Sequence, residues 1–440
     1  MLRRHRDLGC MFAALICGIA PVVADAQGGV WVTKTPMPVP RSHVMAAGIE
    51  GKFYVAGGIN TPASGFTPLD LLELYDPVTD AWITKAPMHD ARDAGGSAVI
   101  GNKLYVAGGQ SAAGDTATLE VYDPVTDAWT TKASMPTARR WPAVEAIGGL
   151  LYVVGGTRDI PGPVAVFATL EVYDPASDTW TAKASLPAPR HSMASGVIDG
   201  KLYLAGGFNV ADAAVATLLI YDPATNTWAE KSPMPTARGF PAGAVLNGQL
   251  YVVTGIASFN SPPLQTVEVY DPTADQWRDE APIPTGRDRL GEVGVIDGRV
   301  YVAGGWNPCF GCDIATLEVF EPAAAIVEVS LDIKPRSSRN SINPKSNGVI
   351  RVAILTTNTF DATIVDPLTV RFGPRGAKEV HSTGHIKDVN HDGNSDLVLH
   401  FKTRATGIKC GDTSASLTGA TFDGDSIEGT DIIRTVGCKR

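Results

Sequence analysis

The sequence predicts an all-β protein in which one four-stranded unit recurs six times, followed by a smaller β-sandwich domain. The first observation is composition: 46 of the 440 residues are glycine and 31 are proline, which is typical of short strands joined by tight turns. The second is a tryptophan that recurs about every 50 residues, as in proteins built from structural repeats. The third is the loss of that repeat near residue 322, which indicates a separate C-terminal domain.

Charge and hydrophobicity exclude several classes of protein. Lys and Arg total 37 and Asp and Glu total 46, so the net charge of −9 argues against a nucleic-acid binder, which needs excess basic residues to displace counterions. Hydrophobic residues make up 44% of the chain, enough to bury a core, which excludes global disorder. After the N-terminus no run of about 20 apolar residues occurs, so we expect no integral membrane segment.

The first 26 residues are predicted to be a signal peptide. Arg3, Arg4 and Arg6 form a basic start, an apolar stretch covers residues 10–20, and small residues at 24–26 suit cleavage before Gln27. We therefore expect a secreted protein, either extracellular or periplasmic.

Three markers recur in register through the repeated part of the chain. The tryptophan series is Trp31, Trp82, Trp129, Trp180, Trp228 and Trp277. The sequence Tyr-Asp-Pro begins at Tyr75, Tyr122, Tyr173, Tyr221 and Tyr270. A hydrophobic run ends in Gly-Gly, as in LYVAGG, with LYVVTG as the one departure. Within the second repeat, these markers and the turn residues predict strands at 95–100, 103–107, 119–122 and 129–132 of an antiparallel meander.

This pattern resembles the kelch repeat over residues 30–322, and the resemblance implies a β-propeller with one blade per repeat. Trp31 heads a fourth strand that lacks the three strands before it, and no tryptophan follows the degenerate marker Phe320-Glu321-Pro322. We therefore expect the N-terminal strand to complete the sixth blade of a propeller spanning residues 27–325. Such closure removes an exposed sheet edge. The tryptophans are expected to pack between blades.

Residues 326–440 are predicted to form the β-sandwich. β-Branched residues gather at 329–333, 349–356, 369–372, 396–401 and 432–436, which read as strands. The strings SLDIKP and HSTGHIKDVNHDGNSDL resemble a β module appended to many secreted bacterial and archaeal proteins, a likeness that implies no activity.

One segment of this domain is a candidate calcium loop. Asp388, Asn390, Asp392, Asn394 and Asp396 place oxygen atoms at alternate positions, and calcium prefers six to eight oxygen ligands. The pattern resembles the nine-residue calcium loops on hairpins of integrin-type repeats. We expect structural calcium as the cofactor; the alternative is a hairpin turn without metal.

Export makes disulfides plausible, and four cysteines follow the signal peptide. Their proximity in sequence predicts the pairs Cys309–Cys312 and Cys410–Cys438. The first pair could instead serve redox chemistry or half of a zinc site.

A second periodic feature is one arginine per repeat, before each inner strand. The six are Arg41, Arg92, Arg139, Arg190, Arg238 and Arg287. In the kelch fold this position lies at the mouth of the central channel, so the arginines could bind an anionic ligand. The alternative, which strict recurrence favours, is that they brace the loops and blades.

Two glutamates interrupt the small residues of the inner strands. Glu145 and Glu292 lie in blades three and six, which face each other in a six-fold ring. A buried carboxylate is costly unless it is paired or hydrated. These two are therefore our candidate catalytic residues, with binding of channel water or pairing with an arginine as alternatives.

The loops after the double glycines vary between blades, as binding loops do, and they contribute Arg158 and Trp306 as candidate ligand contacts. Our first hypothesis is a non-catalytic exported protein that presents one propeller face to a carbohydrate or protein ligand. The second is an enzyme acting on an anionic sugar, similar to the six-bladed kelch mutarotases or epimerases. The third is a structural surface protein. Fold alone does not choose among them.

Overall fold

The computed structural model describes residues 28–61, 67–159, 164–307, 312–323, 326–335, 337 and 339–438. The chain divides into two compact units, residues 1–322 and 323–440. Strands dominate both, and the described residues include two short 3-10 helices, η1 (Ala362–Ile364) and η2 (Thr403–Ala405). None of these helices is long and apolar enough to cross a membrane. The predicted signal peptide and Cys309 lie outside the described residues, as does the predicted Cys309–Cys312 pair.

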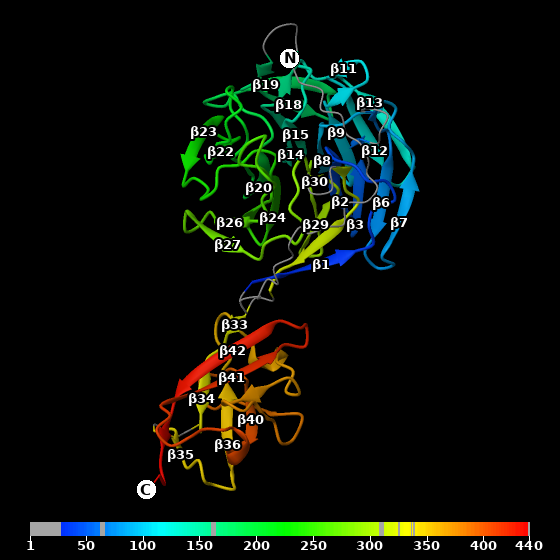
Figure 1. Ribbon diagram of the computed structural model, residues 1–440. Helices are drawn as coiled ribbons and strands as arrows, with labels where there is room; N and C mark the ends of the chain where they lie inside the picture. The colour runs from blue at the N-terminus through cyan, green and yellow to red at the C-terminus, as the bar shows by residue number, and fades with distance from the viewer. Residues whose placement is uncertain are drawn as a thin grey trace. The chain divides into compact units, whose positions relative to one another are not determined.

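The first unit consists of six four-stranded antiparallel sheets, the blades, arranged in a ring (Figure 1). Blade one contains β2 (Met45–Ile49), β3 (Lys52–Ala56), β6 (Leu72–Asp76) and β7 (Ala81–Lys85). Blade two contains β8 (Gly96–Ile100), β9 (Lys103–Ala107), β12 (Leu119–Asp123) and β13 (Ala128–Lys132). Blade three contains β14 (Ala143–Ile147), β15 (Leu150–Val154), β18 (Leu170–Asp174) and β19 (Thr179–Lys183). Blade four contains β20 (Ala194–Ile198), β21 (Lys201–Ala205), β22 (Leu218–Asp222) and β23 (Thr227–Lys231). Blade five contains β24 (Ala242–Leu246), β25 (Gln249–Val253), β26 (Val267–Asp271) and β27 (Gln276–Glu280). Blade six contains β28 (Gly294–Ile296), β29 (Arg299–Ala303), β32 (Leu317–Glu321) and β1 (Val30–Lys34).

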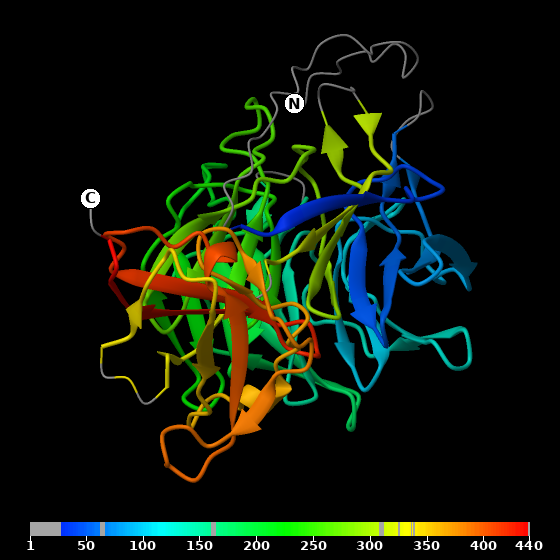
Figure 2. The ribbon, with the colours of Figure 1, turned by 90° about the horizontal axis from the view of Figure 1, so that it is seen from below.

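The N-terminal strand closes the ring. β1 pairs antiparallel with β32, so that Trp31 lies opposite Phe320 in the sixth blade (Figures 1 and 2). The first strands of neighbouring blades contact each other all the way round, including β28 with β2. These contacts confirm the six-bladed all-β propeller and its closure by the N-terminal strand.

Short hairpins extend the loops that follow the double glycines, which we call the rim loops. They are formed by β4 (Ile59–Asn60) with β5 (Thr67–Pro68), β10 (Gln110–Ser111) with β11 (Gly114–Asp115), β16 (Thr157–Arg158) with β17 (Ala165–Val166), and β30 (Trp306–Asn307) with β31 (Cys312–Asp313). Each rim loop begins with a bridge to the residue that follows a recurrent arginine, such as Ser42 with Ile59. The rim loops and the arginine turns therefore lie on one face of the propeller, which we call the rim face.

The tryptophans join the blades. The indole N–H of Trp129 in blade two donates to the carbonyl of Ala86, which follows the last strand of blade one, at 2.8 Å. Each of the six interfaces has the same bond, including Trp31 to Ala281 between blades six and five, and Trp82 to Thr35 between blades one and six. The tryptophans are thus structural, because each satisfies its only polar group on the neighbouring blade.

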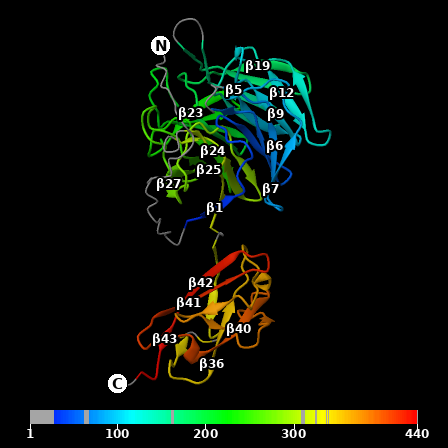
Figure 3. The same ribbon diagram turned by 45° about the vertical axis from the view of Figure 1, so that its right-hand side comes forward.

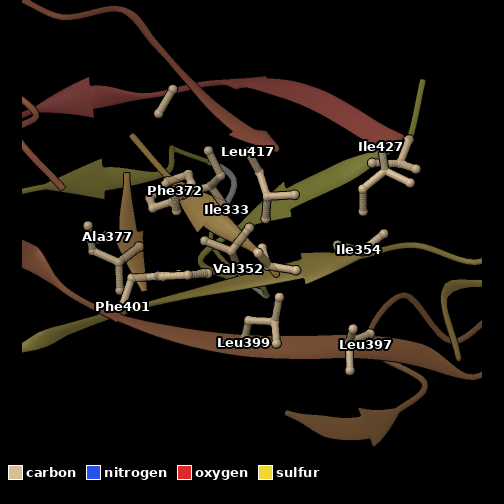
Figure 4. Packing of buried hydrophobic residues seen from close by; sticks show 14 of the residues in the cluster. Ile333, Val352, Ile354, Phe372, Ala377, Leu397, Leu399, Phe401, Leu417 and Ile427 are labelled. Atoms are coloured by element: carbon tan, nitrogen blue, oxygen red, sulfur yellow. The ribbon is translucent and has the colours of Figure 1, made fainter. Parts of the chain in front are cut away.

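The second unit is a β-sandwich. One sheet contains β33 (Val327–Glu328), β42 (Ser426–Ile432), β41 (Ser414–Ala420), β37 (Arg371–Phe372) and β38 (Ala377–Lys378). The other contains β34 (Leu331–Ile333), β36 (Val349–Ile354), β40 (Asp396–Lys402) and β39 (His385–Lys387), and a short pair joins β35 (Ser341–Ile342) to β43 (Arg434–Thr435). Leu399 and Phe401 of β40 meet Phe372 and Leu417 in the core between the sheets (Figure 4).

The longest antiparallel pair of this sandwich was not predicted from the sequence pattern. β41 and β42 pair over seven residues each (Figure 3). β41 reads SASLTGA, in which only Ala415 and Leu417 are buried while serine and threonine face solvent. Because most residues of β41 are small or polar, a search for runs of β-branched residues does not identify this alternation as a strand. The predicted disulfide between Cys410 and Cys438 is present and holds the chain on both sides of the pair.

A candidate binding site on the rim face of the propeller

The six recurrent arginines are enclosed within the blades. Five are fully buried, and Arg190 is 6% exposed. In five blades the guanidinium pairs with a glutamate on the third strand, for example Arg92 with Glu120 at 2.9 Å and Arg139 with Glu171 at 3.0 Å. The complete set of pairs is Arg41–Glu73, Arg92–Glu120, Arg139–Glu171, Arg238–Glu268 and Arg287–Glu318. Burial lowers the pKa of these arginines and the paired glutamates oppose that shift.

This geometry corresponds to the bracing alternative. Arg139 also donates to the carbonyls of Gly155 and Thr169, so its guanidinium ties the rim loop of its own blade to the third strand. The main chain of Arg139 donates to Thr116 of the preceding blade, which links two blades. The predicted ring of arginines therefore presents no exposed charge to a ligand, and the argument for an anionic ligand loses its support.

Blade four breaks the pattern. Leu219 replaces the glutamate, and the Arg190 guanidinium donates instead to the Thr217 hydroxyl at 2.6 Å. No carboxylate of the described residues lies within 4 Å of Arg190, although Glu230 raises its pKa against the larger effect of burial.

The residue two positions after each recurrent arginine shapes the rim face. We call His43, Ala94, Trp141, Ser192, Phe240 and Arg289 the collar. All six have a left-handed backbone, with φ between 51° and 54°. In five of the six collar residues the main-chain N–H donates to the collar carbonyl of the preceding blade, for example from His43 to Arg289 at 2.7 Å and from Phe240 to Ser192 at 3.1 Å. Left-handed conformation is uncommon for such residues, and these hydrogen bonds between blades account for it here.

Three collar side chains meet at the propeller axis. His43, Trp141 and Phe240 come from blades one, three and five, with ring centroids 5.3 to 6.1 Å apart. His191 stacks on Trp141 at 5.7 Å, and Arg140 lies over the same indole at 4.5 Å. Burial, with Arg289 and Arg140 nearby, lowers the pKa of His43 to about 3, so this imidazole is neutral. The rings narrow the channel at the rim face.

Below the rings the channel widens into a cavity of about 300 Å³. Small residues of the inner strands form most of its wall, and both predicted glutamates line it. At the far end Val99 and Ala146 are half-buried and Val295 is 37% exposed, so the cavity is more open there than at the collar.

Neighbouring serines hold the two glutamates. Ser195 donates its hydroxyl to Glu145 at 2.8 Å. Glu292 accepts from the Ser97 main-chain N–H at 2.8 Å and from its hydroxyl at 3.0 Å. Glu292 lies just before β28, which starts at Gly294 and is shorter than the other inner strands. At Gly291 a Cβ atom would approach the Val44 carbonyl to 1.4 Å, so only glycine allows the close approach to blade one.

Burial favours the protonated form of both channel carboxyls. Burial raises the pKa of Glu145 to about 7, and burial together with the nearby Glu145 raises that of Glu292 to about 8. The Ser97 hydroxyl has one proton for two acceptors, Glu292 and the Ala46 carbonyl at 3.2 Å. A protonated Glu292 supplies the second proton. Neither glutamate pairs with an arginine among the described residues, which leaves the hydrated-channel alternative and the acid–base alternative.

The rim loops supply further exposed side chains. Of the predicted contacts, Arg158 is exposed, whereas Trp306 is half-buried under Arg289, whose guanidinium lies 4.5 Å from the ring centroid. Phe259 is 46% exposed and stacks on buried Phe208 at 4.6 Å. Exposed apolar groups also occur at Val164 and Val210 in blades three and four, so this sector of the rim is the more hydrophobic one.

The rim also carries buried carboxyls. Burial, with Asp115 and Asp313 nearby, raises the pKa of Asp93 to about 7 against the opposing effect of Arg140. Arg140 itself contacts Asp159 at 2.7 Å. The rim face is therefore mixed in charge rather than uniformly basic.

The candidate calcium loop in the second unit folds on itself. Asp388 accepts the main-chain N–H groups of His391 and Gly393, and Asp392 accepts that of Asn394 at 2.8 Å. Asn390, Asp392 and Asn394 are exposed and available to an ion. Asp396 is fully buried, and its two oxygens accept from Thr356 and Val389 at 2.9 Å each. It therefore anchors the base of the loop, while the remaining oxygen donors suit calcium.

Sequence reasoning missed the collar. The position two residues after each arginine varies from alanine to tryptophan, and the positions on either side of it vary as well, so no period marks it. The left-handed backbone that points these side chains to the axis leaves no mark in a search for strands.

Comparison with known proteins supports the same fold. The family model described as KLHDC2/KLHL20/DRC7 Kelch-repeats domain matches residues 29–185, and the Kelch motif model matches residues 189–235 and 237–284. Alpha-scruin of Limulus polyphemus is 26% identical over 186 residues, covering 42% of this chain and 16% of that protein. Kelch-like protein terF of Aspergillus terreus is 28% identical over 182 residues, covering 41% of this chain and 30% of that protein.

The chain thus spans less than a third of the length of these curated relatives. The solved structure titled "Structure of YjhT" superposes with a TM-score of 0.55 at 16% identity, covering 64% of this chain and 95% of that one, a likeness of fold alone. Together the two kelch models cover more than half of the chain in register with its blades, and the protein therefore belongs to the kelch-repeat β-propeller family.

Proposed function

We propose that this protein is an exported binding protein whose propeller receives a protein ligand on the rim face. The observation that supports the proposal is the contrast between the repeated scaffold and the collar with its rim loops. Scaffold positions recur in each blade, whereas the collar presents His43, Trp141 and Phe240 at the axis. Aromatic and arginine side chains contribute most binding energy in protein interfaces, and this face provides both.

The hydrophobic sector of blades three to five is the proposed contact area. Phe259, Val210 and Val164 are exposed in the rim loops of these blades, and Phe259 packs near Phe240, which contacts the half-buried Trp141. Exposed apolar groups that gather at one place mark interaction sites more often than single ones do. Arg158 lies in the same rim loop as Val164 and adds a charged contact.

The test compares variants of opposite faces. Ligands would be captured from the culture medium or periplasm, identified, purified and titrated against the chain from residue 27 onward. We expect Phe259→Asp and Val210→Asp to weaken binding at least about tenfold, because they place charge in the apolar sector. Val78→Asp and Val125→Asp are matched controls, since these residues are 88% and 91% exposed at turns on the opposite face. Equal affinities for all four variants would refute the rim-face site.

Export is part of this proposal, and the basic and apolar start of the chain supports it. N-terminal sequencing of the protein from its source cells is expected to begin at Gln27. Recovery of the protein in the cytoplasm with its first 26 residues intact would contradict export.

A second candidate ligand is a carbohydrate bound in the channel. The cavity lined by Glu145 and Glu292 supports this candidate, because carboxyls that can be protonated both donate hydrogen bonds to sugar hydroxyls and accept hydrogen bonds from them. Saturation-transfer NMR with neutral and anionic sugars is expected to show a neutral sugar that binds the wild type and is lost in Glu145→Gln. New anomeric resonances would instead identify the mutarotase-like enzyme. No transfer from any sugar would eliminate the channel as a sugar site.

We propose that calcium braces the second unit through Asp388, Asn390 and Asp392. Calcium is expected to raise the unfolding temperature of this unit in the wild type but not in Asp388→Ala, as expected of an ion that binds the folded state alone. The matched control is Asp366→Ala in the same unit, outside the loop. An equal effect of calcium on all three proteins would contradict the assignment.

A further inference from the structure

Three histidines converge in the second unit, outside the candidate calcium loop. His381, His385 and His400 each place one ring nitrogen within 4.8 Å of the nitrogens of the other two. Their ring centroids lie 5.0 to 5.6 Å apart. Among the described residues, this is the one group of three or more histidine, cysteine or acidic side chains that converges closely enough for a metal ion.

The strand register places two of these histidines. His385 of β39 lies opposite Val398 of β40, and His400 follows Val398 by two residues, so His385 and His400 share one face of the sheet. The alternate residues Leu397 and Leu399 point into the core, which turns His400 to the outer face. Neighbouring strands thus hold two imidazoles on a rigid surface, as metal sites require.

Glu379 places the third histidine. Its side chain is only 2% exposed, and one oxygen accepts the main-chain N–H of His400 at 3.0 Å. The other oxygen accepts the N–H groups of His381 and Ser382, which folds the loop back over β40. The same carboxylate lies 3.4 Å from Nδ1 of His381 and 3.8 Å from Nδ1 of His400. A carboxylate in this position orients metal-binding imidazoles and offsets the charge of the ion.

The polar atoms of the cluster are only partly satisfied by protein. Nδ1 of His400 is buried without a hydrogen-bond partner. His381 is half exposed, so an ion can enter from solvent. In a tetrahedral zinc site the nitrogens lie about 2.0–2.1 Å from the metal and thus about 3.3 Å apart. Small rotations of the exposed His381 and His385 side chains would close the present spacing to that value.

We propose that His381, His385 and His400 form a binding site for a divalent transition-metal ion, with zinc as the fitting occupant. Three neutral imidazoles suit zinc, copper or nickel, whereas calcium and magnesium prefer oxygen ligands. Glu379 is a positioning residue in this site. The bound ion fixes the loop of residues 379–385 to the outer face of the sheet and leaves a fourth coordination position toward solvent.

The test is a zinc titration of the chain from residue 27 onward, after treatment with a chelator and in the presence of excess calcium. We expect one zinc ion per chain with a dissociation constant of about 1 μM or below, and at least about a hundredfold loss of affinity in His385→Ala, which removes one of three ligands. The exposed His385 carries little packing, so this variant is expected to stay folded. His391→Ala is the matched control, because His391 is an exposed histidine in the adjacent loop.

Cobalt provides a second readout of coordination. The wild type with cobalt is expected to show the visible absorption of a four-coordinate ion, which His381→Ala and His385→Ala lose and His391→Ala retains. Unchanged zinc affinity in His385→Ala would overturn the proposal. Loss of the zinc site in a Cys309→Ser, Cys312→Ser variant with the histidines intact would also overturn it, in favour of the cysteine pair.

Discussion

The propeller and the β-sandwich solve the problem of holding strands together in different ways. The propeller repeats one set of contacts at six interfaces: an indole bond to the neighbouring blade, and in five blades a buried arginine–glutamate pair. The sandwich uses each contact once, such as the Cys410–Cys438 disulfide and the Glu379 loop anchor. In the propeller two glutamates that depart from the repeat mark the channel site, whereas in the sandwich the histidine cluster is found only from its geometry.

The largest effect is expected from breaking the repeated arginine–glutamate pair. Arg139→Leu leaves Glu171 buried without its partner and should cost about 3–5 kcal/mol of unfolding free energy. Arg190→Leu should cost clearly less, because Leu219 occupies the position of the glutamate and no carboxylate is stranded. Denaturant unfolding followed by tryptophan fluorescence measures both, since all eight tryptophans lie in the propeller. Equal losses would show that the pair does not brace the blades.

The next effect concerns the sandwich alone. Replacing Cys410 and Cys438 with serine opens a loop whose ends are 28 residues apart and should cost about 3 kcal/mol. Hydrogen exchange of the β41 and β42 amides reports this loss. The fluorescence transition of the propeller serves as the internal control. A shift of that transition would show that the two units do not unfold independently.

The smallest expected effect sharpens the contrast within the propeller channel. The pKa of a glutamate in the unfolded chain is near 4.5, whereas burial raises the pKa of Glu292 to about 8 in the folded chain. The folded state therefore holds a proton that the unfolded state releases, and its stability falls as the pH rises from about 4.5 to about 8. Glu292→Gln removes this loss of stability. The difference in unfolding free energy between the variant and the wild type should therefore be about 1–3 kcal/mol more favourable to the variant at pH 9 than at pH 5.

Glu145→Gln is the matched comparison for Glu292. Its pKa is raised to about 7, so its gain with pH should be smaller and complete at a lower pH. Thermal unfolding at a series of pH values measures both variants. Identical pH dependence in wild type and Glu292→Gln would show that this carboxyl is ionised in the folded channel.

The sequence predicted the blades well because each strand is marked at both ends. In the second repeat the predicted strands at 103–107 and 129–132 agree with β9 and β13 within one residue. The sandwich was harder to predict, since small and polar residues make up most of β41 (SASLTGA) and of β42 (SIEGTDI). Their strand character comes from pairing with each other and from the burial of Leu417 of β41 in the core, which are long-range effects.

The sequence by itself determined the number of blades, the closing strand and the positions of the arginines, because each follows from a period read along the chain. It also showed Glu145 and Glu292 as departures from that period. Only the tertiary structure decided what these residues face. It turned the arginines onto buried glutamates, placed His43, Trp141 and Phe240 together at the axis, and set His400 beside two histidines that precede it by 15 to 19 residues. Such meetings depend on strand register and blade packing, which join residues distant along the chain.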